Sequence, residues 1–180
     1  MSTLSSTSAS SSRTAVQEVL VDAFGRIREE FADLCDGLSQ ADAARRPTAD
    51  ANSIAWMLWH LTRIQDDHVC GITGDEQVWT SDGWYDRFGM PFGPREHGYG
   101  HNSEQVAAVQ VEPALLDGYH AAVHELTIAY VATVDDTELA RVVDECWDPP
   151  VTASVRLVSV IGDCMQHLGQ AAYVRGMLGG

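Results

Sequence analysis

Residues 163–170 read DCMQHLGQ and lie inside a long run of helix-forming and apolar residues, 152–178. Asp163 and His167 are four positions apart, so on a helix their side chains stand one above the other on one face. A carboxylate and an imidazole at this spacing can bind one divalent metal ion. The third ligand has to come from another element, and His60, in the segment WMLWHL, is the leading candidate. The sequence therefore predicts an open metal site in a helical bundle.

Hydrophobic periodicity predicts four helices, each with an apolar stripe that recurs at three- and four-residue steps. The expected ranges are 14–38, 54 to about 71–74, 113–134 and 152–178. Helices of about 20 residues span about 30 Å, which suits an all-α four-helix bundle. Residues 135–150 are acidic and then Pro-rich, so we expect a loop there and no strand of consequence.

The second predicted helix places His60 at the edge of a broad apolar arc, beside Trp56. Trp59, Thr62 and Asp66 project to the opposite face of this helix. An edge position is shielded from bulk water without being enclosed in hydrocarbon, and this is a suitable environment for a metal ligand.

A long connection, residues 74–111, separates the second and third predicted helices and is rich in Gly, Pro and aromatic side chains. A connection of this length is usually functional or disordered, and so many large aromatic residues argue against disorder. Two interpretations stay open. The segment forms a folded flap that lines a pocket at one end of the bundle, or it only covers core that the crossover exposes.

Five other histidines are possible ligands. His120 and His124 have the same four-residue spacing, but on a helical wheel they lie opposite the apolar stripe of their helix, so we expect them to face solvent. His97 and His101 belong to the aromatic connection and could reach over the site. His68 could approach it as well, although it lies two turns beyond the proposed ligand of the second helix.

Composition indicates a soluble globular protein, because 45% of the 180 residues are hydrophobic and 21% are charged. We expect a polar Ser-rich tail over residues 1–13 and a single domain over 14–180. The 11 basic and 26 acidic residues give a formal charge of −15, which argues against nucleic acid or an anionic membrane as a partner.

The four cysteines are widely scattered and form no C-x-x-C pair, which argues against a zinc ribbon or a thioredoxin-type motif. Neither a secretory signal nor a membrane-spanning apolar run is apparent. We therefore expect reduced thiols and a cytoplasmic location.

Three segments carry a family resemblance: WMLWHLTRIQDDH (56–68), GYGHNSEQVAAV (98–109) and RLVSVIGDCMQHLGQAAYVRG (156–176). Together they resemble the DinB-like superfamily, and most closely its actinobacterial mycothiol transferase-like branch. The resemblance implies a DinB-like four-helix bundle whose metal site uses His60, Asp163 and His167. Relatives usually carry His or Glu at the position of Asp163.

What the resemblance implies for function is a transferase that activates a low-molecular-weight thiol, mycothiol above all, for attack on a small electrophile. The metal would be a divalent ion, zinc first, with nickel or iron as alternatives. Bundles of this kind often dimerise, so we allow for a homodimer. The alternatives are a metal-dependent hydrolase, an iron oxygenase, and a non-enzymatic metal-binding stress protein on the same bundle.

Four further residues are candidates for holding substrate or orienting the ligands: Trp56, Asp67, Gln170 and Arg175. Asp67 is the general base that the hydrolase alternative would use. Gln170 lies one turn beyond His167. Arg175 projects into the apolar arc of the last helix, so we expect it to pair with an acidic side chain.

Overall fold

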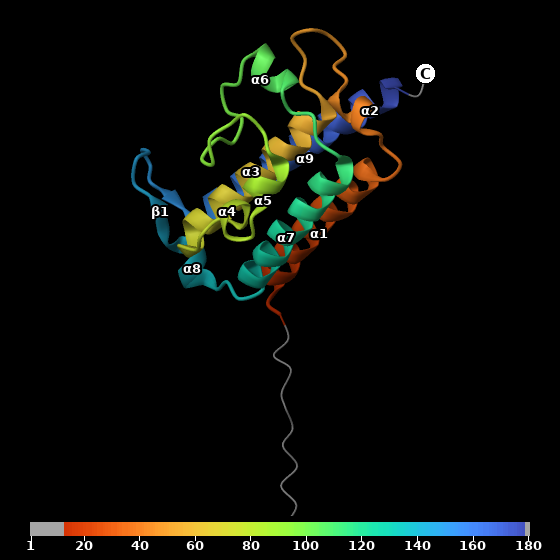
Figure 1. Cartoon of the computed structure of the whole chain (residues 1–180). Helices are drawn as coiled ribbons and strands as arrows, with labels where there is room; N and C mark the ends of the chain where they lie inside the picture. The colour runs from red at the N-terminus through yellow and green to blue at the C-terminus, as the bar shows by residue number, and fades with distance from the viewer. Residues whose placement is uncertain (1–12, 179–180) are drawn as a thin grey trace, which may run out of the picture.

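A computed structural model describes residues 13–178, so the predicted tail, residues 1–13, lies outside the described residues except for Arg13. Four long helices dominate the structure: α1 (Ala15–Cys35), α3 (Ile54–Thr73), α7 (Pro113–Val131) and α9 (Ala153–Leu178). Both α1 and α3 pack against α7 and α9, which closes the four helices into a bundle (Figure 1). The predicted all-α four-helix bundle is confirmed.

The ends of the long helices carry residues that suit those positions. The hydroxyl of Thr14 accepts a hydrogen bond from the amide of Gln17 at the start of α1, and Ser53 caps α3 in the same way. Gly74 ends α3 with a φ of 82°, a conformation that glycine adopts without strain. Pro113 occupies the first turn of α7, where its missing amide hydrogen is not needed.

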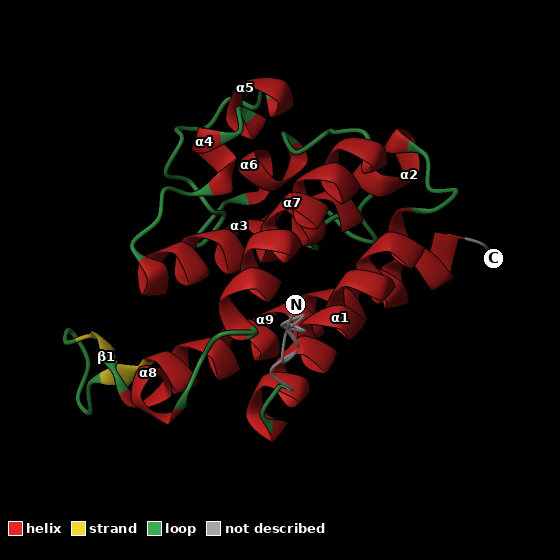
Figure 2. Cartoon of the chain, turned by 90° about the horizontal axis from the view of Figure 1, so that it is seen from below, coloured by secondary structure: helices red, strands yellow, loops and turns green. Residues whose placement is uncertain are grey.

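Shorter elements fill the connections (Figure 2). The additional helices are α2 (Gln40–Ala44), α4 (Val78–Ser81), α5 (Trp84–Phe88), α6 (Ser103–Ala107) and α8 (Asp136–Ala140). Strands β1 (Val142–Asp144) and β2 (Val151–Thr152) pair in antiparallel fashion. The expectation of a plain loop over 135–150 was therefore wrong, because such short strands leave no alternating pattern to detect. Among the described helices, none has the length and apolar character needed to cross a bilayer.

The long connection has a topological cause. Helices α3 and α7 run in the same direction along the bundle, so the chain must return along the length of α3 before α7 begins (Figure 1). Residues 74–111 make this return and carry α4, α5 and α6. They fold over α3, and for this reason almost the whole circumference of that helix is buried.

A buried ion pair anchors this crossover. Asp66 accepts hydrogen bonds from the amides of Val78 (3.0 Å) and Trp79 (2.8 Å) and from the hydroxyl of Tyr119 (2.7 Å). The Arg63 guanidinium lies 3.5 Å from the Asp66 carboxylate, and neither side chain has any exposed surface. Arg63 also donates to the main-chain carbonyls of two crossover residues, Pro94 (3.4 Å) and Glu96 (3.2 Å). The face of α3 that lies opposite the apolar arc is thus covered by the crossover, and Trp59 and Thr62 are buried with Asp66.

The expectation that His120 and His124 face solvent was wrong. His120 is fully buried, and its ring stacks on Phe31 with 4.0 Å between centroids. His124 is half-buried beside it. Because α7 packs against both α1 and α3, its buried face is wider than the single stripe that a helical wheel identifies. One turn before His120 on α7, Asp117 forms an ion pair with Arg28 of α1 at 2.7 Å.

The ion pair yields a first prediction. Asp66→Leu removes the acceptor for two backbone amides and one hydroxyl, and it leaves the buried Arg63 charge unpaired. The free energy of unfolding, measured with urea, should fall by about 3–5 kcal/mol. Asp22→Ala removes one partner of an exposed pair with Arg26 and should change it little. Equal effects of the two substitutions would contradict the anchoring role.

A second prediction concerns pH. Burial, with smaller contributions from the Arg28 cation and from His124, holds the pKa of His120 well below its ordinary value. Below pH 6.5 or so the unfolded chain gains a proton at this ring that the folded chain does not take up. Stability is therefore intact above about pH 6.5 and is lost as pH falls below it, toward the lowered pKa.

The free energy of unfolding, measured with urea, should fall between pH 7.5 and pH 5.5 in the wild type. In His120→Gln this fall should be smaller by about 1 kcal/mol. The matched variant Thr127→Val changes another buried polar side chain of α7, which does not titrate, so it should keep the wild-type pH dependence. An unchanged pH dependence in His120→Gln would contradict the assignment.

Candidate metal centre

His60 lies on α3 in a setting that fixes both its orientation and its charge. Its ring stacks on Trp56, with centroids 4.7 Å apart and planes 13° apart, and only 6% of the residue is exposed. Its Nδ1 faces the main-chain carbonyl of His97 in the crossover. Burial lowers the pKa of His60, which favours the neutral imidazole that a metal requires.

Gly98 permits this close approach of the crossover. Its φ is 95°, and a Cβ built there would lie 3.0 Å from Nδ1 of His60 and 3.0 Å from the Trp59 ring. A side chain at this position would therefore force the crossover away from α3. The sequence predicts that His97 and His101 could reach the site, but this role of Gly98 and of the His97 carbonyl was not predicted. The Gly-rich stretch GYGH was the available signal.

Asp163 and His167 stand on the facing side of α9. His167 Nε2 lies 3.7 Å from Asp163 Oδ1, as the four-residue spacing predicts. His167 Nδ1 lies 3.0 Å from the side-chain oxygen of Gln170, one turn further along α9. The His60 and His167 rings meet edge to face, with centroids 4.9 Å apart.

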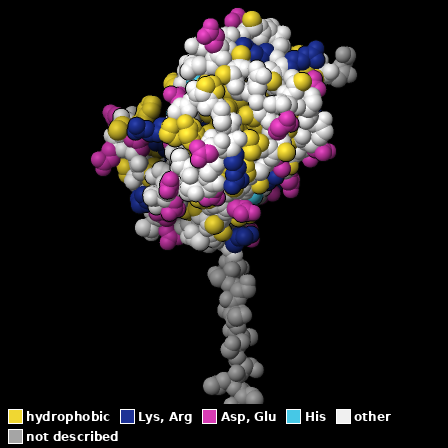
Figure 3. Space-filling view, in the orientation of Figure 1, with side chains coloured by type: hydrophobic (Ala, Val, Ile, Leu, Met, Phe, Trp, Pro, Cys, Tyr) yellow, Lys and Arg dark blue, Asp and Glu magenta, His cyan; other side chains and the backbone are white. Residues whose placement is uncertain are grey.

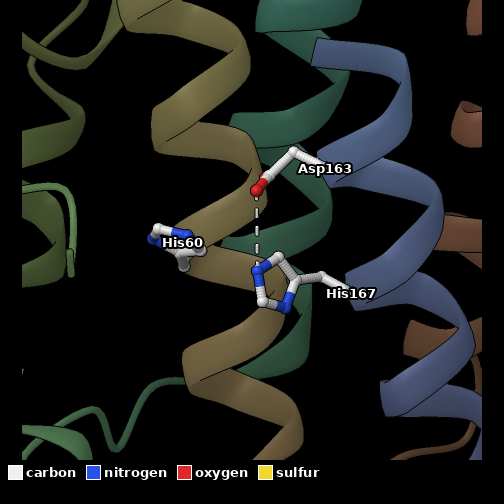
Figure 4. A group of neighbouring side chains, drawn as sticks. All are labelled: His60, Asp163 and His167. Carbon is white, nitrogen blue, oxygen red and sulfur yellow. Dashed lines mark ion pairs between the residues drawn. The ribbon is translucent and has the colours of Figure 1, made fainter. Parts of the chain in front are cut away.

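The structure brings the three predicted ligands together (Figure 4). One ligand atom from each of His60, Asp163 and His167 lies within 4.8 Å of the other two. In both imidazoles Nδ1 faces an oxygen acceptor, so it carries the hydrogen and leaves the lone pair on Nε2. The His97 carbonyl can only accept, which assigns this tautomer to His60, and the Gln170 oxygen favours the same tautomer for His167.

An unsatisfied carboxylate oxygen shows that the cluster suits a cation. Oδ2 of Asp163 is buried and has no hydrogen-bond partner among the described residues. Such an atom is costly unless a donor or a cation satisfies it. Two nitrogens and one carboxylate oxygen suit zinc and related divalent metals, and three protein ligands leave positions for small molecules. The side chains of Asp163 and His167 are 31% and 17% exposed, so small molecules have access on the α9 side.

The crossover supplies an aromatic wall behind His60. The Trp56 indole donates a hydrogen bond from Nε1 to Nδ1 of His101 at 3.2 Å. His101 stacks on Trp59 with 5.7 Å between centroids and lies 4.8 Å from the Phe92 ring. Burial lowers the pKa of His101, so this ring too is held neutral. His101 therefore helps to position the Trp56 ring, on which His60 stacks, and does not itself belong to the cluster.

The other candidate residues separate into two groups. Trp56 and Gln170 contact the cluster directly, as described above. Asp67 instead accepts a hydrogen bond from Gln77 (2.7 Å) and, together with His68, lines a different cavity. Arg175 does not pair with an acidic side chain as expected. Its guanidinium donates to the main-chain carbonyls at positions 33 and 36, at the end of α1, where a cation is favourable.

A comparison with protein families matches residues 19–180 to the family described as Mycothiol-S-transferase. The chain belongs to this family. A similar solved structure, described as the conserved protein of locus from Enterococcus faecalis, has 32% sequence identity and a TM-score of 0.84. The match covers 90% of this chain and 96% of that one. No match was found among curated proteins. The mycothiol-S-transferase membership confirms the resemblance noted in the sequence.

The contact between Gln170 and His167 yields a third prediction. Gln170→Ala removes the acceptor that fixes the His167 tautomer, so zinc affinity should fall about 10–100-fold. Competition with a chromophoric chelator measures this affinity. Gln166→Ala is a matched control, because Gln166 bonds only to the Gly162 carbonyl of its own helix. Unchanged zinc affinity in Gln170→Ala would show that the hydrogen bond does not orient the ligand.

Proposed function

We propose that this protein is a metal-dependent thiol S-transferase that joins mycothiol to a small electrophile. The observation that supports this most directly is the cluster of His60, Asp163 and His167, in which one ligand atom from each lies within 4.8 Å of the other two and one side is accessible. Family membership supports mycothiol as the thiol.

Residues of the chain would hold the metal and orient its ligands. His60, Asp163 and His167 are the proposed ligands, with zinc as the first choice and nickel or iron as alternatives. The His97 carbonyl and Gln170 keep the two rings in the required tautomer. The bound cation would lower the pKa of a thiol below the free value of about 8.5.

The proposed reaction is a substitution. The thiol loses its proton to solvent, its sulfur forms a bond to an electrophilic carbon, and the leaving group departs with its bonding electrons. Trp56 and the aromatic wall limit the access of water from the α3 side. The hydrolase alternative is less well supported, because Asp67, its candidate base, lines another cavity. A cytoplasmic location and a homodimer remain predictions.

The fourth prediction tests catalysis. Zinc-loaded protein should accelerate the conjugation of mycothiol with monochlorobimane, followed by fluorescence at pH 7. Only about 3% of a thiol with a pKa of 8.5 is ionised at this pH, so complete ionisation alone would raise the conjugation rate roughly 30-fold. His60→Ala should lose this acceleration, and elemental analysis should show that it has lost its metal.

His68→Ala is the control for this experiment. His68 lies on the same helix, outside the cluster, and its loss should leave the rate intact. The proposal fails if wild type and His60→Ala conjugate mycothiol at the same rate. A non-enzymatic metal protein would instead show a lower melting temperature after metal removal without any thiol chemistry.

A further inference from the structure

An apolar cavity of about 300 Å³ adjoins the metal centre. It lies where the first turn of α3 and the segment before that helix meet the last turns of α9. Its apolar lining consists of Pro47, Ala51, Met57, Tyr173, Val174 and Met177. This volume falls at the lower end of the range for small-molecule sites.

The lining of this cavity contrasts with the acidic side chains that are scattered over the face of the molecule shown in Figure 3. The chain carries a formal charge of −15, yet every side chain that lines the cavity is uncharged. Another cavity of the described chain is lined by Asp36, Glu112 and Asp117. A third contains Asp144 and Arg156. A charged group that entered the apolar cavity would lose water and find no counter-charge.

The cavity and the metal cluster share a wall. Gln170 lines the cavity, and its side-chain oxygen lies 3.0 Å from Nδ1 of His167. On α3, Met57 precedes His60 by three residues, about 4.5 Å along the helix. A small molecule that occupied the cavity would therefore have one end at Gln170, the hydrogen-bond partner of the proposed ligand His167.

We propose that this cavity binds the apolar part of the electrophile, so that the enzyme prefers neutral aromatic or branched alkyl electrophiles to carboxylate-bearing ones. The inference rests on the proposed function, because it assigns the second substrate of the same site. The electrophilic carbon would lie at the Gln170 end, and the apolar group would pack between Met57 and Met177. The thiol would then approach from the exposed side of Asp163 and His167.

A matched pair of substrates tests the preference. Methyl 4-(bromomethyl)benzoate and 4-(bromomethyl)benzoate share the reactive carbon and differ in one charge. After correction for the uncatalysed rates, kcat/KM with mycothiol should be at least about 10-fold higher for the ester. Equal values for the ester and the carboxylate would overturn the inference and leave the proposed transferase function standing.

Variants at exposed positions locate the site without threatening the core. Met177 is 46% exposed in the cavity wall, and Val158, on the same helix, is 67% exposed and lies outside it. Met177→Asp should lower the ratio of kcat/KM for the ester to that for iodoacetamide about 10-fold. Val158→Asp should leave this ratio unchanged. Equal ratios in the two variants would overturn the assignment.

Binding of the neutral probe N-phenyl-1-naphthylamine gives a readout that needs neither metal nor thiol. Its fluorescence should rise when wild type or His60→Ala is added. With Met177→Asp, the protein concentration that gives half of the maximal rise should be at least about 10-fold higher. Equal binding by Met177→Asp would overturn the inference. So would a dimer that Met177→Asp converts to a monomer in sedimentation, because the cavity would then be a contact between copies. If wild type conjugates no electrophile, the proposed function fails, whereas probe binding still reports on the cavity.

Discussion

The buried pair of Arg63 and Asp66 is the interaction on which the rest of the structure depends. Two charges without solvent contact are tolerated only when their remaining hydrogen-bonding capacity is satisfied. The partners come from the crossover and from α7: the amides of residues 78 and 79, the carbonyls of residues 94 and 96, and the hydroxyl of Tyr119. The pair therefore forms correctly only when the crossover is folded onto α3. Apolar contacts alone would not specify that position so narrowly.

The same segment of crossover completes the candidate metal centre. The carbonyl of residue 96 accepts a hydrogen bond from Arg63, and the carbonyl of the next residue, His97, accepts one from His60. One ligand is therefore oriented by tertiary structure at long range. The other two, Asp163 and His167, are placed by the spacing of α9 itself, with help from Gln170. Helix geometry and crossover folding contribute separately to one site.

This division explains what could be predicted from the sequence. The long helices and the Asp163–His167 pair follow from local periodicity, and His60 can be recognised because it lies at the edge of an apolar arc. The burial of Asp66 and His120 could not be predicted, since it depends on which helices and loops cover a second face. The partners of Arg175 were missed for a similar reason, because main-chain carbonyls at the end of another helix leave no signature in side-chain patterns. Gly98 could be seen as a turn residue, but its contact with His60 required the fold.

The dependence of His60 on the crossover also bears on dynamics. Proteins open locally at a lower free-energy cost than they unfold, and loops open more readily than bundles. If residues 94–98 lift away, His60 loses the acceptor at its Nδ1 and Arg63 loses two carbonyl acceptors. Asp66 keeps its partners from residues 78, 79 and 119, so the rest of the crossover and the bundle can stay in place. A bound cation would then be released more readily without unfolding of the bundle, because one of its ligands is no longer held in the required tautomer. Conversely, a cation that binds only the closed form, at 100 times its Kd, would favour closure by about 2.7 kcal/mol.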